Sequence, residues 1–180
     1  MDFSFLWYNK FMTVPAKLIL LRILLIPVFL ALFFSGLQIY ALAVFALAAI
    51  TDLFDGIIAR ARGQMTDFVK IMDPLADKLL ICSALIALVS AGAVAAWLAI
   101  LIVARDFIIT GLRLMAAGKG AVLGAVITGK ANTAFQMFLI MAILVGVPDI
   151  IVTILVYIVV ILTVISTAEN LMKMRSRGLL

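Results

Sequence analysis

Histidine is absent from this 180-residue chain, and cysteine occurs once, at Cys82. The lack of histidine removes imidazole as a general base and as a metal ligand, and one cysteine cannot form a disulfide within the chain. Charged residues are scarce as well, at 13% of the sequence. A soluble domain of this length could not bury the 67% of residues that are hydrophobic, so the sequence indicates a protein of the lipid bilayer.

Long apolar runs predict an all-α integral membrane protein. A transmembrane helix needs about 20 predominantly apolar residues. Six segments are candidates: 16–34, 38–59, 69–90, 94–115, 130–147 and 150–168. We therefore expect one six-helix membrane domain over residues 16–180, ending in a short cytoplasmic tail. Residues 1–15 are expected to form a short amphipathic helix in the membrane interface, because Phe3, Trp7 and Phe11 recur every four residues.

The net charge of +5 follows membrane topology and does not indicate a nucleic-acid partner. The connections near residues 35–38, 91–92 and 146–149 carry no Lys or Arg. This asymmetry predicts a multi-pass membrane protein with both termini on the cytoplasmic side. Arg105 is then the one basic residue well inside a span, and the others lie near cytoplasmic ends: Lys10, Lys17, Arg22, Arg60, Arg62, Lys70, Lys78, Arg113, Lys119, Lys130, Lys173, Arg175 and Arg177.

Acidic residues concentrate in one stretch, since five of the nine lie within residues 51–80. Asp52 and Asp55 are three residues apart near the end of the second predicted span, and Asp73 and Asp77 are four apart near the start of the third. Each pair shares one face of its helix. Because the connection between the two helices is short, we expect them to be antiparallel neighbours whose four carboxylates converge.

Four carboxylates at one place inside a membrane need compensating charge. One possibility is structural salt bridges with Arg60, Lys70 and Lys78. The other, which we favour, is a site for two Mg²⁺ or Mn²⁺ ions, which prefer oxygen ligands and would balance four negative charges. Gly56 and Ala59, each one turn from an aspartate, leave room for a bulky ligand, although small residues are also common between membrane helices. Arg60 offers a donor fork suited to phosphate, so the stretch predicts a pyrophosphate site.

The segments "DLFDGIIAR" (52–60) and "VKIMDPLAD" (69–77) together resemble the signature of the CDP-alcohol phosphotransferase family. The likeness extends to "VPAKLILLRILLIP" (14–27), "ARDFIITGLR" (104–113) and "GKANTAFQM" (129–137). It implies a six-helix membrane fold, commonly a homodimer, that joins CDP-diacylglycerol to an alcohol and releases CMP. The resemblance also implies roles for individual residues. Metal ligands would be Asp52, Asp55, Asp73 and Asp77, with Asp77 also the general base; Gly56, Ala59 and Arg60 would line the CDP moiety; Arg105, Arg113 and Lys130 would hold the phosphate of glycerol 3-phosphate.

The three cations can also be weighed by their positions alone. Arg105 inside a span is costly unless it lines a wet cavity or has a partner, and the adjacent Asp106 is one candidate. Arg113 and Lys130 flank the connection between the fourth and fifth predicted spans, where basic side chains also reach for the interface. Together the three would form a basic pocket, which a phosphorylated acceptor needs and an uncharged alcohol does not.

The chain departs from the family pattern at four positions. The family usually has Asn, Thr and Gly where this chain has Ala16, Ile19 and Val69, and one subgroup of the family usually has a second Lys where it has Asn132. Val69 shares a face with Asp73 and Asp77, so a glycine there is expected to improve the fit of the nucleotide; the alternative is that Val69 packs against lipid or a neighbouring helix. Other functions stay open: a different acceptor such as inositol phosphate, a non-catalytic relative, or a transporter.

Overall fold

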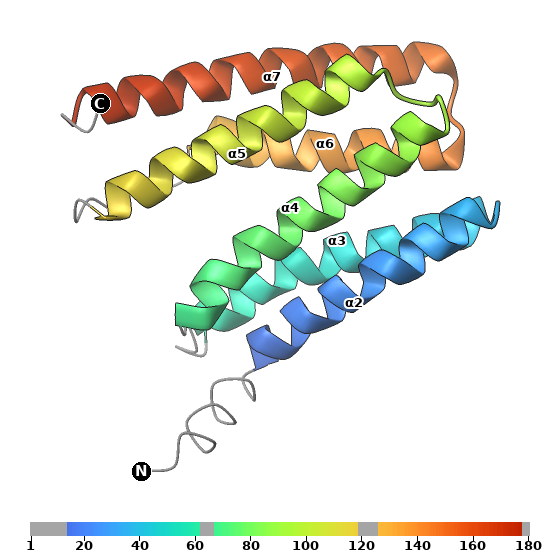
Figure 1. Ribbon diagram of the computed structural model, residues 1–180, viewed down its shortest axis with the longest axis horizontal. Coiled ribbons are helices and arrows are strands. Elements are labelled where there is room, and N and C mark those ends of the chain that lie inside the picture. Colours follow the sequence, from blue (N-terminus) through green and yellow to red (C-terminus); the bar gives the residue numbers. More distant parts are fainter. Residues whose placement is uncertain (1–13, 62–66, 119–125, 178–180) are drawn as a thin grey trace. The chain divides into compact units, whose positions relative to one another are not determined.

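The computed structural model describes residues 14–61, 67–118 and 126–177, without the side chains of residues 15, 52–61, 67, 68, 70, 71, 117 and 118. The predicted interfacial helix over residues 1–15 lies almost wholly outside this part. Within it the chain forms six helices and no strand (Figure 1). They are α2 (Val14–Phe34), α3 (Gln38–Ala61), α4 (Asp67–Ser90), α5 (Ala96–Gly118), α6 (Ile127–Val145) and α7 (Asp149–Arg175).

Each of the six predicted apolar segments corresponds to one of these helices. The largest difference is at α7, which continues from the predicted residue 168 to Arg175, because no glycine or proline interrupts residues 149–177. By length and composition α2, α6 and α7 are able to cross a membrane, and residues 38–51 of α3 form a shorter apolar stretch. Large apolar side chains face outward, among them Leu24 (65% exposed) and Ile100 (67% exposed). Such surfaces are stable in lipid and not in water.

Three tight turns follow α2, α4 and α6, and each is closed by a glycine with positive φ: Gly36, Gly92 and Gly146. In each turn the residue after the glycine donates its N–H five residues back, for example Leu37 to the Leu32 carbonyl at 3.0 Å. This is the Schellman arrangement, which satisfies carbonyl groups at a helix end and needs a left-handed residue that only glycine adopts readily. These are the three connections that the sequence shows to lack basic residues.

The described helices form two compact units, residues 1–87 and 88–180, with the boundary inside α4. In the N-terminal unit α2 and α3 lie side by side. Ala41, Phe45 and Ala48 of α3 are buried at helical spacing, and Phe45 meets Phe29 of α2 with 5.7 Å between ring centroids. The alanines let the two backbones approach, which is how helices pack where lipid replaces water.

A second apolar contact in the same unit joins α2 to the start of α4. Ala16 and Ile19 of α2 form one buried cluster with Val69 and Ala76 of α4. Three of the four departures from the family pattern, Ala16, Ile19 and Val69, are therefore packed against one another. With 3% of its surface exposed, Val69 lies in a helix–helix contact, which favours the packing alternative for this residue.

In the C-terminal unit α6 lies beside α7, and α5 also contacts α7. The buried residues of α7 recur every three or four positions along one face: Val159, Thr163, Ser166, Asn170 and Met174. Met174 packs with Ala116 of α5. Three of the five residues in this stripe are polar, so the contact differs in kind from the apolar ones of the N-terminal unit.

Replacing Val69 by glycine should destabilise the protein by about 1–3 kcal/mol. The change removes buried contacts with Ala16 and Ile19 and introduces a poor helix former. Thermal unfolding in detergent measures the effect, with Leu75→Gly as the control, because Leu75 is an exposed residue of the same helix and loses helix propensity alone. Equal losses of stability in the two variants would contradict the packing role.

Candidate active site

The predicted acidic residues lie on two helices of the N-terminal unit. Asp52 and Asp55 belong to the second half of α3, as do Gly56, Ala59 and Arg60, and the side chains of all five are outside the described part of the structure. Asp73 and Asp77 lie one turn apart in the first half of α4, and both are half-buried. The convergence of all four carboxylates stays a prediction.

Arg22 of α2 is fully buried and forms an ion pair with Asp73, with 3.4 Å between Nη1 and Oδ1. The carboxylate side chain of Asp73 is 33% exposed. The pair joins the same two helices as the apolar α2–α4 cluster, whose half-buried members Ile23 and Met72 are the sequence neighbours of Arg22 and Asp73. A cation in such surroundings is stable only with a partner, so Arg22 and Asp73 fix each other across the two helices.

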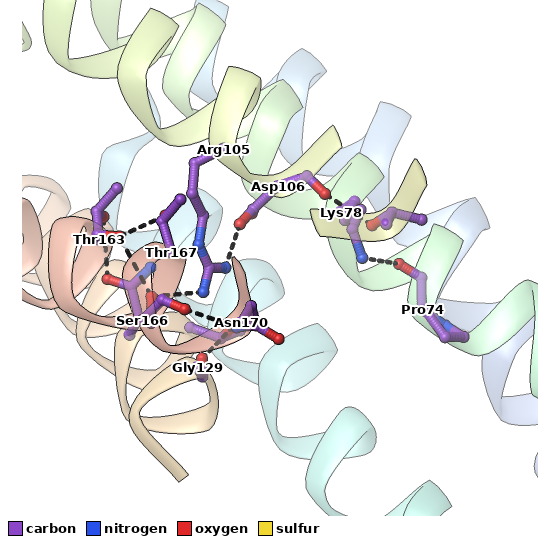
Figure 2. A network of polar contacts seen from close by, with 12 residues as sticks. Pro74, Lys78, Arg105, Asp106, Gly129, Thr163, Ser166, Thr167 and Asn170 are labelled. Carbon is purple, nitrogen blue, oxygen red and sulfur yellow. Dashed lines mark hydrogen bonds and ion pairs between the residues drawn. The ribbon is translucent and has the colours of Figure 1, made fainter. Parts of the chain in front are cut away.

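This contact gives a structural role to Arg22, which the sequence interpretation treated only as a topological charge near the cytoplasmic end of a span. Arg22 is the ninth residue of α2, about 12 Å from its start at 1.5 Å per residue. A signal was present in the sequence, since Arg22 stands alone between "LILL" and "ILLIP". Lys78 was another proposed partner of the carboxylates; its Nζ donates to the carbonyl of Pro74 at 3.2 Å (Figure 2).

No three metal-ligating residues come together among the described side chains, which include Asp73 and Asp77 and not Asp52 or Asp55. The two aspartates that are described offer carboxylate oxygens one helical turn apart, which suits Mg²⁺ or Mn²⁺ and not a softer ion. Their chemistry and spacing fit the expected ligand set.

Arg105 provides the centre of a polar network in the C-terminal unit (Figure 2). The residue is buried in α5, and its Nη1 donates to Asp106 Oδ1 at 2.7 Å. Its Nη2 donates to Ser166 Oγ on α7 at 2.6 Å. The sequence suggested Asp106 as a partner, and the structure confirms this. Ser166 was not predicted.

The other two predicted phosphate ligands are in more open positions. Arg113, two turns further along α5, is half-buried, and its Nε finds no acceptor within the described residues. Lys130 is exposed at the start of α6. A Cβ atom built on its neighbour Gly129 would lie 3.5 Å from Arg105 Nη2. The Arg105 guanidinium therefore lies against the backbone of α6 directly before Lys130.

A buried polar seam between α6 and α7 continues from this network. Asn132 Oδ1 accepts from Thr163 Oγ1 at 3.2 Å, and Gln136 is fully buried one turn further along α6. Asn132 stands where one subgroup of the family usually has a second Lys, and its side chain contacts Thr163 of α7. Thr163, Ser166 and Asn170 were missed because the sequence interpretation followed charges; their spacing of three and four residues in an apolar helix was the available signal.

Comparison with known proteins assigns the chain to a class. Residues 12–165 match the family model of CDP-alcohol phosphatidyltransferases, and this protein belongs to that family of membrane enzymes.

Several proteins have sequences similar to this chain over more than half of their length. A CDP-diacylglycerol–glycerol-3-phosphate 3-phosphatidyltransferase of Bacillus subtilis is 37% identical over 145 residues, covering 72% of this chain and 75% of the relative. The protein of that name from Rickettsia typhi is 36% identical over 135 residues, or 73% and 76% of the two chains. A probable phosphatidylglycerophosphate synthase of Mycobacterium tuberculosis is 42% identical over 125 residues, or 66% and 59%.

Replacing Arg22 by methionine should lower the free energy of unfolding by about 3 kcal/mol. This is the lower end of the range of about 3–5 kcal/mol for breaking a buried ion pair, because water reaches Asp73, whose side chain is 33% exposed. Lys17→Met is the matched control, since Lys17 is an exposed cation of the same helix. Thermal unfolding of both variants distinguishes the two interpretations of Arg22. A purely topological charge would make the variants equally stable, and that result would contradict the structural role.

Proposed function

We propose that this protein transfers the phosphatidyl group of CDP-diacylglycerol to glycerol 3-phosphate, forming phosphatidylglycerophosphate and CMP in phospholipid biosynthesis. The observation that carries the proposal is the family membership of the chain together with its complete aspartate pattern, Asp52, Asp55, Asp73 and Asp77. Relatives named for this reaction support the choice of acceptor.

The proposed setting is the cell (inner) membrane, with six spans, both termini and the active site on the cytoplasmic side, and a homodimeric assembly as the family resemblance implies. The six helices support the number of spans. The topology is supported by three tight turns without basic residues, together with Lys173 and Arg175 in the last turn of α7.

The residues of α3 and α4 would bind the metal ions and the nucleotide. Asp52, Asp55, Asp73 and Asp77 would hold two Mg²⁺ or Mn²⁺ ions, which when bound neutralise the pyrophosphate and stabilise the leaving CMP. Arg60 would contribute a fork of N–H donors to the CDP phosphates.

Asp77 would carry out the proton transfer. Its carboxylate would accept the proton of the acceptor hydroxyl as that oxygen forms a bond to the phosphorus bearing diacylglycerol. The bond between this phosphorus and the CMP oxygen breaks in the same displacement. Little covalent work falls to the protein in such a reaction, so the position and charge of the side chains decide the rate.

A cluster of cations would select a phosphorylated acceptor. Arg105, Arg113 and Lys130 are each able to donate charge-assisted hydrogen bonds to a phosphate. Arg105 is already paired with Asp106, but its Nε–H has no acceptor among the described residues and would be able to donate to a substrate phosphate. An acceptor without a phosphate would leave this donor unused.

An acceptor panel tests the proposal. Purified protein with CDP-diacylglycerol should release CMP when glycerol 3-phosphate and Mg²⁺ or Mn²⁺ are added, and not with glycerol. Inositol phosphate is the second candidate, since it also presents a phosphate to the three cations. If CMP is released with inositol phosphate and not with glycerol 3-phosphate, inositol phosphate is the acceptor and the proposal is wrong. If no acceptor gives CMP release, the protein is a non-catalytic relative or a transporter.

Asp77→Asn should abolish turnover and leave CDP-diacylglycerol binding measurable, because an amide is unable to accept the proton. Turnover is followed by CMP release and binding by ligand-induced thermal stabilisation. Parallel loss of binding would assign Asp77 mainly to the metal. Activity above about a tenth of the native rate would exclude it as the base, since a positioned general base contributes about 100-fold or more.

Arg113→Ala and Lys130→Ala should raise the KM for glycerol 3-phosphate far more than the KM for CDP-diacylglycerol. We expect roughly 10- to 100-fold for the half-buried Arg113 and less for the exposed Lys130, whose contact is screened by water. Lys173→Ala, a cation of the last turn of α7, serves as the control. Equal increases in both KM values would show that the acceptor phosphate binds elsewhere.

A further inference from the structure

Two partners on two helices hold the guanidinium group of Arg105. Asp106, its neighbour on α5, accepts from Nη1 at 2.7 Å, and Ser166 on α7 accepts from Nη2 at 2.6 Å. Figure 2 shows the side chain extending from α5 toward α7 between these two residues. The Nε–H group has no acceptor among the described residues, although it is buried. The Nε–H donor of the Arg105 guanidinium group is therefore unused among the described residues.

The two partners differ in what they do to the charge. Asp106 carries a negative charge and neutralises the arginine, which weakens its attraction for an anion. Ser166 is neutral, so its hydrogen bond restrains Arg105 and leaves the charge available. Because Ser166 belongs to another helix, it also determines how far the arginine side chain extends from α5.

The hydroxyl group of Ser166 is itself held in place. Ser166 is fully buried, and its Oγ donates to the carbonyl of Thr163 at 3.3 Å. With its hydrogen directed along α7, the oxygen presents its lone pairs to Arg105. Asn170 Nδ2 donates to the carbonyl of Ser166 at 2.7 Å and adds a further contact within the same turns of α7. A fixed acceptor orients a flexible side chain better than a mobile one does.

We propose that Ser166 is a positioning residue that aims the donor fork of Arg105 at the phosphate of the acceptor. This inference rests on the proposed function and adds a residue from α7 to it. The match to the family model ends at residue 165, so Ser166 takes no role from that match. Without the hydroxyl, Arg105 would keep its charge and its pair with Asp106 and would lose its fixed direction.

The test compares Ser166→Ala with Thr167→Val. Thr167 is the adjacent residue, and its Oγ1 also donates to the Thr163 carbonyl, at 2.6 Å, so the control removes the same kind of bond within α7 and leaves Arg105 untouched. Ser166→Ala should raise the KM for glycerol 3-phosphate about three- to tenfold, with kcat and the KM for CDP-diacylglycerol within about twofold. Thr167→Val should match the native protein, and Ser166→Thr, which keeps a hydroxyl, should recover part of the loss.

A second measurement avoids turnover. Thermal stabilisation of the purified protein by glycerol 3-phosphate alone should require a higher concentration in Ser166→Ala, by the same factor as the KM. In an Arg105→Lys background, Ser166→Ala should have a smaller effect than in the native protein, because residues that act through one another are not additive.

Each remaining outcome contradicts the inference. Equal changes in Ser166→Ala and Thr167→Val would show that α7 packing alone is involved. An unchanged KM for glycerol 3-phosphate in Ser166→Ala would remove the positioning role while the native activity upholds the proposed function. Native protein that releases no CMP with glycerol 3-phosphate would overturn the proposed function itself, and with it the role of Ser166.

Discussion

A charged side chain inside a membrane helix has no water to solvate it, and the arrangement of polar groups in this protein follows from that constraint. Arg22 and Arg105 are both buried in predominantly apolar helices. Each has a carboxylate partner, Asp73 in the N-terminal unit and Asp106 in the C-terminal unit. The Arg22–Asp73 pair joins two helices, α2 and α4. The Arg105–Asp106 pair lies within α5, and it is the hydrogen bond from Arg105 to Ser166 that extends to α7.

The two units solve helix packing in different ways. In the N-terminal unit, Ala16, Ile19 and Val69 replace the polar and small residues usual in the family, and they pack together. Three departures that look independent in the sequence thus form one apolar contact between α2 and α4. The polar contribution of α2 is the Arg22–Asp73 pair beside that contact, so the helix still supports the aspartate that is a candidate metal ligand.

In the C-terminal unit the contact between α6 and α7 includes buried polar side chains, and this has a consequence for function. Side chains such as Asn132, Thr163 and Ser166 give the bundle fixed hydrogen-bonding positions inside an otherwise apolar interior. An arginine placed among fixed dipoles is already oriented before a substrate arrives, which is the form of preorganisation that favours anion binding. A phosphate acceptor fits this surrounding better than a neutral alcohol does.

The sequence by itself determined the helices and the family of the protein. Apolar length predicts α2 to α7 to within a few residues at most ends, because a span must cover the bilayer whatever its neighbours are. The aspartate spacing identifies the family, since ligands on one helix face repeat with the helical turn. Tertiary structure decided which polar groups meet. Nothing local to Arg22 indicates Asp73, which is far along the chain, and nothing local to Arg105 indicates Ser166 on α7. Such pairs depend on how the helices pack against one another. Helical periodicity shows on which face of its helix a residue lies, but it does not show which residue of another helix that face contacts.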